Sequence, residues 1–131
     1  MIQQASESTQ RFSNRVADYI RFRPGYPEAL LQTIKDRTDL STQSNAADMG
    51  SRTGISAFLF LQLGVAVFAV EPNKAMREAG ESGLSSHANF HSIDARAEQT
   101  TLQNSSIDLI ISGQAFHWFN LKLTKFEWQR I

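Results

Sequence analysis

The stretch "AADMGSRTGIS" (46–56) decides the fold that the sequence predicts. Apolar residues lead into Met49, a turn bracketed by Gly50 and Gly54 follows, and an apolar run typical of a helix comes next. Glycine permits positive φ angles and close approach of the backbone to a ligand, and a helix N-terminus carries partial positive charge. The stretch is therefore either a cofactor-binding loop or a plain strand-to-helix turn, and two glycines alone do not decide between them.

Length and composition bound the possibilities. The 131 residues fit one domain, and 13 basic side chains cancel 13 acidic ones, which gives no electrostatic argument for nucleic acid or an anionic membrane. The absence of cysteine excludes disulfides, a thiol nucleophile and thiolate metal sites, and no other metal-binding cluster is expected. No apolar run is long enough to span a bilayer, and the polar N-terminus lacks a signal-peptide pattern, so a cytoplasmic location is expected.

Helical and strand-like patterns alternate along the chain. Strands are expected at 46–49, 65–70, 89–93 and 107–112, and helices at 8–22, from Pro27, and at 54–64, 73–81 and 123–131. Two of the strands are apolar throughout, as strands buried on both faces are. The alternation predicts an α/β, Rossmann-like three-layer sandwich: a mostly parallel, incomplete sheet of about four strands, plus N-terminal helices. The charges of "NKAMREAGE" (73–81) are expected to form a solvated helix face.

Glu71 strengthens the case for a cofactor loop. It closes the second predicted strand, 17 residues after Gly54. In parallel sheets, ligands bind beyond the carboxyl ends of the strands, and a carboxylate there can accept hydrogen bonds from both hydroxyls of a ribose. The alternative is that Glu71 only stabilises the next helix N-terminus, by about 0.3–1 kcal/mol. The loop and the carboxylate together favour a ribose-bearing cofactor.

At these positions the sequence resembles the class I S-adenosylmethionine-dependent methyltransferases, in particular the type 11 branch. The family's first motif, an acid followed by G-x-G-x-G, matches Asp48, Gly50 and Gly54, and its second-strand acid matches Glu71. Further matching segments are "RFRPGYP" (21–27) and "DARAEQTTLQNSSIDLIISGQAFHWF" (94–119). The resemblance runs from about Phe12 to the last residue.

The resemblance implies a single, C-terminally truncated domain (1–131), with a helical lid at 1–40 and a cofactor-binding half at 45–131. It also implies residues that bind S-adenosylmethionine. They are Asp48, Gly50 and Gly54 for the methionine part, Glu71 for the ribose, Met76, Ala97 and Glu98 for the adenine, Gln114 and Ala115 beside the sulfonium, and Tyr19, Arg23 and Tyr26 in the lid.

Catalysis of methyl transfer depends mainly on positioning and on exclusion of water. Phe116 and Trp118 are available to face the sulfonium cation, although packing in the core or against a helix is the more common role for them and for Phe119. His117 is the candidate base for removing a proton from the acceptor, or else a structural hydrogen-bonding residue.

Arg52 departs from the family motif, because it occupies the position of the middle glycine. Its Cβ takes up room beside the expected cofactor, and a positive φ angle there would add about 1–2 kcal/mol. We expect the affinity for S-adenosylmethionine to be weakened and an Arg52→Gly variant to restore it.

The end of the chain is a second departure. The family continues past "EWQRI" (127–131) into further strands that complete the sheet and part of the acceptor pocket. We therefore expect the strand at 107–112 to have an unpaired edge, which invites self-association or a partner chain.

Three interpretations remain open at this point. The chain is a methyltransferase acting on a small-molecule acceptor, since it lacks a basic surface for nucleic acid. Alternatively, it is an inactive truncated remnant that binds cofactor weakly or acts through protein association. The third interpretation is a nicotinamide-dinucleotide protein. Such proteins have the pattern G-x-G-x-x-G, and no third glycine follows Gly54 in the predicted helix, so the pattern disfavours this interpretation.

Overall fold

The computed structural model of the protein describes residues 28–113 and 116–131, apart from the side chain of His117. The elements are α2 (Glu28–Arg37), β1 (Asn45–Met49), α3 (Ile55–Leu61), β2 (Ala66–Val70), α4 (Lys74–Leu84), β3 (Phe90–Ile93), β4 (Leu109–Ile111), the 3₁₀ helix η1 (Phe116–Trp118) and α5 (Leu121–Arg130). Every predicted strand is present, with ends within one or two residues of the prediction. The helix predicted at 8–22 lies outside the described residues.

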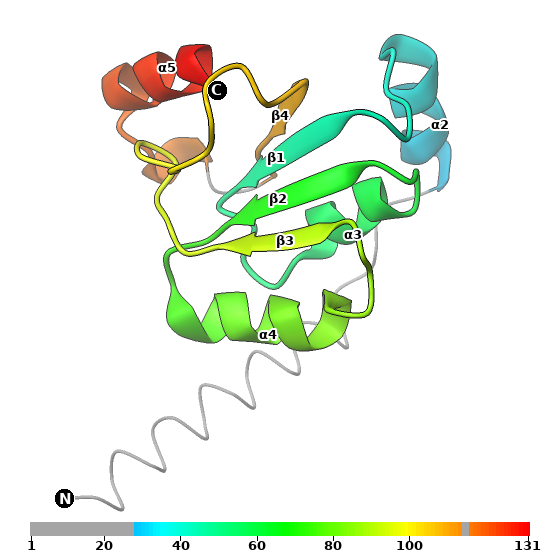
Figure 1. The fold of residues 1–131 in the computed structure, drawn as a ribbon, viewed down its shortest axis with the longest axis horizontal. Coiled ribbons are helices and arrows are strands. Elements are labelled where there is room, and N and C mark those ends of the chain that lie inside the picture. The colour runs from blue at the N-terminus through cyan, green and yellow to red at the C-terminus, as the bar shows by residue number, and fades with distance from the viewer. Residues whose placement is uncertain (1–27, 114–115) are drawn as a thin grey trace, which may run out of the picture.

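The four strands form one parallel sheet in the order β3-β2-β1-β4. The register pairs Met49 with Val70 and Val70 with Ile93, so the carboxyl ends of β1, β2 and β3 lie at one edge. Figure 1 shows the arrowheads of these three strands pointing the same way. We call this edge, where the chain leaves each strand, the carboxyl rim. The strand order reverses at β1, between β2 and β4, which is where α/β sheets bind ligands.

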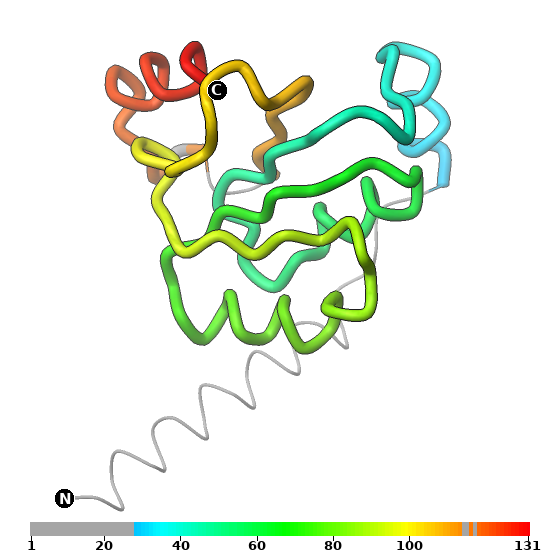
Figure 2. The backbone as a smooth tube through the Cα atoms, in the orientation of Figure 1, coloured from blue at the N-terminus to red at the C-terminus, as the bar shows by residue number. Residues whose placement is uncertain are grey.

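Two apolar cores, one on each face of the sheet, confirm the three-layer prediction. One core joins β2 to α3 and α4 through Ala57, Leu59, Phe60, Leu61, Val67, Ala69 and Leu84. The other joins β1 and β2 to the loop after β3 and to the end of α5 through Ala47, Met49, Val70, Ala95, Ala97, Leu102 and Ile131. Alternate strand residues supply the two cores, as a strand period of two residues requires. Figure 2 follows the chain from β3 through the long loop beside α5 and on into β4.

Side-chain caps explain where α4 and α5 begin. The Asn73 side chain accepts a hydrogen bond from the backbone N–H of Met76 (3.0 Å), and Asn120 does the same for Leu123 (3.1 Å). Both caps satisfy donors that a helix N-terminus leaves unpaired. α3 instead begins at Gly54, whose φ of 88° is left-handed.

α2 lies near the amino ends of the strands in Figure 1, away from the carboxyl rim. Its half-buried Leu31 and Ile34 pack against the α3 side of the core. The rest of the predicted lid, including Tyr19, Arg23 and Tyr26, lies outside the described residues. Among the described helices, none is long and apolar enough to cross a membrane.

β4 is the element that differs most from expectation. It is limited to Leu109–Ile111, and these residues are half-buried instead of buried on both faces. The chain just before the strand bonds elsewhere: the backbone N–H groups of Ser106 and Ile107 donate to the carbonyl of Ile131 (2.7 and 3.0 Å). Within the described part of the chain, only β1 pairs with β4, so β4 is an edge strand there, as predicted.

Candidate functional site: the carboxyl rim

The loop from Gly50 to Gly54 folds back onto the end of β2. The backbone N–H groups of Gly50 and Ser51 donate to the carbonyl of Val70, at 2.9 and 3.1 Å. Gly50 (67°) and Gly54 (88°) both have positive φ angles, the conformation that glycine adopts without a steric cost. The glycine loop and Glu71 therefore lie next to each other at the carboxyl rim.

The Glu71 carboxylate connects the glycine loop to the start of α4. One oxygen accepts the backbone N–H of Arg52 at 2.8 Å, and the other accepts the N–H of Asn73 at 2.9 Å. The side chain is buried, with 6% of its surface exposed. Each carboxylate oxygen has a second lone pair, so both can still accept a hydrogen bond from a ligand hydroxyl. Glu71 thus supports the helix N-terminus and retains the capacity to hold a ribose.

Gly54 is favoured by its left-handed backbone, with a φ of 88°, and by the room around it. A Cβ atom there would lie 2.6 Å from Cδ1 of Leu84, on α4. The glycine loop also packs closely on Gly80 of the same helix, where a Cβ would lie 3.4 Å from the backbone of Thr53. The positive φ angle is the main constraint on position 54, because the Leu84 side chain could shift to make room for a Cβ atom.

Arg52 has the left-handed backbone that its motif position predicts, with a φ of 53°. A long side chain rarely adopts this region, at a cost of about 1–2 kcal/mol. The hydrogen bond from its N–H to Glu71 is one interaction that holds the loop in place. Its side chain is half-buried, and among the described residues the guanidinium makes no hydrogen bond or ion pair.

Asp48 lies beneath the loop, near the end of β1, with 1% of its surface exposed. Burial is the main cause that raises its pKa to about 8, and the negative charge of Glu71 raises it further, while a hydrogen bond from the Ala57 backbone opposes the shift. One oxygen, Oδ2, is buried without a hydrogen-bond partner among the described residues, as is Oγ1 of Thr53 in the loop. Asp48 is therefore mostly protonated at pH 7 and has unused hydrogen-bonding capacity.

Three further predicted residues lie on the segments that follow β2 and β3 at the carboxyl rim. Met76 lies in the first turn of α4, half-buried. Ala97 and Glu98 follow β3; Ala97 is buried, and the Glu98 carboxylate accepts the N–H of Asn120 at 2.9 Å. Gln114 and Ala115 lie outside the described residues. His117 lies in η1, which follows β4 beyond its carboxyl end.

The role of Arg77 at the rim was not predicted from the sequence, in which Arg77 was expected on a solvated helix face. Only 14% of its side chain is exposed, and Nη1 donates to the carbonyl of Glu71 (3.1 Å) and to Oδ1 of Asp94 (3.0 Å). It therefore ties together the ends of β2 and β3. Arg77 has helical spacing from Gly80 and Leu84, which places the three residues on one face of α4. From that spacing, the buried position of Arg77 could have been predicted. The solvated-face prediction fits the exposed ion pair of Lys74 with Glu78 (3.8 Å).

Phe116 and Trp118 are exposed, at 48% and 74%, so neither is a core residue. The Phe116 ring does contact Trp128 of α5, with ring centroids 6.0 Å apart, which agrees with the helix-packing part of the expectation. A depression of about 450 Å³ lies over α5 and η1, lined by Phe116, Leu121, Thr124, Lys125, Trp128 and Gln129.

Within the described residues, no group of His, Asp or Glu side chains could hold a metal ion.

The fold and the rim define a doubly wound α/β protein of the kind that binds nucleotide-like cofactors. The chain belongs to the methyltransferase domain family, which matches residues 47–131. S-adenosylmethionine is the cofactor that this family membership indicates.

Individual relatives agree with the family. The chain is 30% identical over 112 residues to the "Probable S-adenosylmethionine-dependent methyltransferase CRG1" of Saccharomyces cerevisiae, covering 81% of this chain and 38% of the yeast protein. A structure from Anaeromyxobacter dehalogenans, assigned as a type II methyltransferase, superposes with a TM-score of 0.72 and 30% identity, over 84% of this chain and 44% of that one.

A second similar structure shows the fold alone, because its sequence identity is 15%. It is the geranyl diphosphate C-methyltransferase of Streptomyces coelicolor, bound to Mg²⁺, geranyl diphosphate and S-adenosyl-L-homocysteine, with a TM-score of 0.69 over 79% of this chain and 39% of that one. The chain spans between 38% and 44% of the length of the first three curated relatives that it matches.

Proposed function

We propose that the protein binds S-adenosylmethionine at the carboxyl rim and transfers its methyl group to a small-molecule acceptor. The observation that carries the proposal is the contact between the glycine loop and Glu71, in which the backbone of Arg52 donates to the carboxylate at 2.8 Å. This contact puts a carboxylate with free lone pairs beside a loop of positive-φ backbone, at the point where the strand order reverses.

The residues present fit the adenosyl group. Glu71 would accept hydrogen bonds from the ribose hydroxyls, and Met76 and Ala97 would flank the base from α4 and from the loop after β3. The buried, unpartnered oxygens of Asp48 and Thr53 are hydrogen-bonding groups that a ligand in the loop would satisfy. Arg52 is the residue that fits least well, because its side chain occupies the loop where the family has glycine.

When bound, S-adenosylmethionine supplies a methyl group activated by a positively charged sulfur. The protein's own residues bind and orient the two reactants and exclude water, with reacting atoms about 3–3.5 Å apart. His117, at η1, is the candidate to take the proton from an acceptor hydroxyl or amine. The neutral charge balance favours a small acceptor over nucleic acid. The cytoplasmic location, the lid at 1–40 and association through the β4 edge remain predictions.

The alternative is a weak or inactive cofactor binder, and the φ of 53° at Arg52 is the observation that favours it. Isothermal titration of wild type and Arg52→Gly with S-adenosylhomocysteine tests whether Arg52 weakens binding, and methyl transfer to a screened set of acceptors separates an active enzyme from an inactive binder. Glycine relieves the left-handed backbone and opens the loop, so we expect affinity to rise about tenfold, equivalent to about 1.4 kcal/mol.

Retention of labelled S-adenosylmethionine by the 131-residue chain tests the proposal itself. We expect a thermal shift with S-adenosylhomocysteine and none with NAD, because a ligand that binds the folded state raises its apparent stability. A shift with NAD alone would replace the proposal by the dinucleotide alternative. No binding by either wild type or Arg52→Gly would contradict cofactor binding altogether.

A further inference from the structure

The segment between β3 and β4 passes the adenine side of the proposed site, and we call residues 94–106 the adenine-side loop. Apart from an isolated bridge between Arg96 and Gln99, it has no helix or strand of its own. Thr101 and Ser105 have left-handed φ angles of 66° and 53°. Such conformations persist in non-glycine residues only where the surroundings hold them. The loop therefore depends on support from another element.

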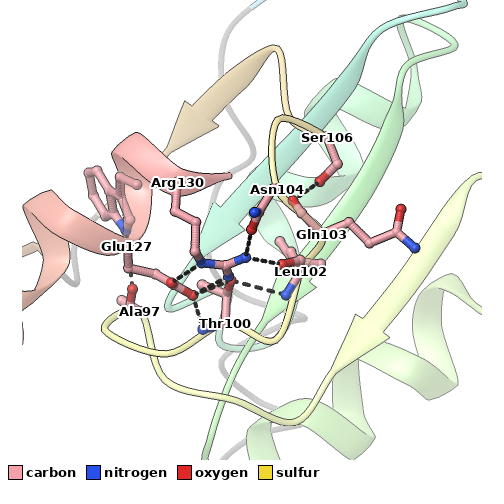
Figure 3. A network of polar contacts seen from close by, with 9 residues as sticks. Ala97, Thr100, Leu102, Gln103, Asn104, Ser106, Glu127 and Arg130 are labelled. Carbon is pink, nitrogen blue, oxygen red and sulfur yellow. Dashed lines mark hydrogen bonds and ion pairs between the residues drawn. The ribbon is translucent and has the colours of Figure 1, made fainter.

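α5 supplies that support through Glu127 and Arg130. Glu127 accepts hydrogen bonds from the backbone N–H and the hydroxyl of Thr100, which is fully buried. Arg130 donates to Glu127 from Nε (2.7 Å) and Nη2 (2.9 Å), and from Nη1 to the carbonyl of Leu102 and to Asn104 (both 2.7 Å). Figure 3 shows both side chains of α5 directed at the loop. One helix face thus holds the loop over several residues.

The same helix also holds the two loop residues expected beside the adenine. The indole N–H of Trp128 donates to the carbonyl of Ala97 at 3.2 Å. Glu98 accepts the N–H of Asn120, which caps α5, at 2.9 Å. Both ends of the helix are therefore bonded to the part of the loop that would meet the base.

We infer that α5 positions the adenine-side loop for recognition of the base, and that Glu127 is the positioning residue through which it does so. This inference rests on the proposed function, because it assigns the adenine to Ala97 and Glu98. Every group that faces the Glu127 carboxylate is a donor: the Thr100 N–H, the Thr100 hydroxyl and the Arg130 guanidinium. A glutamine amide could keep its oxygen toward Thr100 only by turning its N–H groups toward the Arg130 guanidinium, which is itself a donor, so Glu127→Gln should weaken the hold of α5 on the loop.

The test compares two ligands that differ only in the base. S-adenosylhomocysteine and S-inosylhomocysteine share their ribose and homocysteine parts, but inosine has a carbonyl where adenine has its amino group. We expect wild type to prefer the adenosyl compound about tenfold or more, and Glu127→Gln to reduce that ratio to about threefold or less. Glu78→Gln is the matched control, because within residues 28–113 and 116–131 the Glu78 side chain makes an exposed ion pair with Lys74 and no other polar contact.

A role in folding alone would lower stability without changing this base preference, provided titrations are run where each variant is folded. If Glu127→Gln does not fold, Trp128→Phe serves instead, because it removes the donor to Ala97 and keeps an aromatic ring in place. A ratio in either folded variant equal to that of wild type would overturn the inference and leave the proposed function intact.

Failure of the proposed function has a different signature, in which wild type binds neither compound. That result would overturn the assignment of adenine as well. Amide hydrogen exchange then tests the support of the loop by itself: faster exchange at 97–104 in Glu127→Gln than in Glu78→Gln is expected, and equal exchange would contradict positioning by α5.

Discussion

Two regions of this molecule hold a buried carboxylate against a loop, and they do so differently. At the carboxyl rim, Glu71 accepts backbone N–H groups only, from Arg52 and Asn73. On α5, Glu127 is bonded to the Arg130 guanidinium as well as to Thr100. The first arrangement leaves acceptor capacity for a ligand, whereas the second is satisfied within the protein. This contrast is what we expect if the rim is the binding region and the α5 region supports it.

Glu71→Gln should have the largest effect, because it disrupts the binding region directly. The amide N–H groups of glutamine would face the N–H of Arg52 or Asn73, leaving a buried donor without an acceptor. We expect a loss of about 2–3 kcal/mol in the free energy of unfolding, and at least about a 100-fold loss of affinity for S-adenosylhomocysteine. Urea unfolding and isothermal titration measure the two effects. Glu78→Gln controls for the substitution itself, and unchanged affinity in Glu71→Gln would remove the ribose role.

Of the two buried carboxylates, only Glu71 could be predicted from the sequence. Glu71 could be found because a strand and its register are local patterns, and parallel strands bring their carboxyl ends to one edge. Glu127 could not, because its partner Thr100 is 27 positions away, in a loop without periodicity. Arg77 lies between these cases: its helical face was visible, but its partner Asp94 on a separate element was not. Sequence patterns predicted the sheet and the binding loop, whereas the long-range polar contacts required the structure.

The free energy of unfolding at low pH should show the contribution of Glu127 in the α5 region. Hydrogen bonding from Arg130 is the main cause that lowers the pKa of Glu127 from 4.5 to about 2. A carboxyl whose pKa is lowered by folding stabilises the protein above its unfolded pKa and loses that stabilisation as the pH falls. We expect about 2 kcal/mol to be lost between about pH 4.5 and 2 in wild type, and no such loss in Glu127→Gln. Unfolding by urea across this range checks the prediction, and parallel curves for the two proteins would contradict it.

Asp48 should show the opposite pH dependence in the rim region. Burial raises its pKa from 3.8 to about 8, so between these values the folded state keeps a proton that the unfolded state has lost. Stability therefore falls as the pH rises from about 4 to 8, and levels off above 8. We expect Asp48→Asn to be more stable than wild type by about 1–2 kcal/mol at pH 8.5, and to lose the slope. Thermal unfolding at several pH values measures this, and a slope that survives in Asp48→Asn would assign it to another group.

The smallest effects come from a matched pair of threonines, one in each region. Oγ1 of Thr53 in the glycine loop and Oγ1 of Thr124 in α5 are both buried without a hydrogen-bond partner among the described residues. Valine removes the unpaired hydroxyl at nearly the same volume, so each Thr→Val variant should gain at most about 1 kcal/mol in stability.

Affinity for S-adenosylhomocysteine then distinguishes the two regions. If the rim is the binding region, the Thr53 hydroxyl is available to the ligand, and Thr53→Val should weaken binding about threefold to tenfold. Thr124→Val should leave binding unchanged, because the Thr124 hydroxyl lies on α5 and not in the glycine loop. Equal affinities for the two variants would mean that the unpaired hydroxyl of the loop does not meet the ligand. In that case binding at the rim would depend on Glu71, Asp48 and the loop backbone.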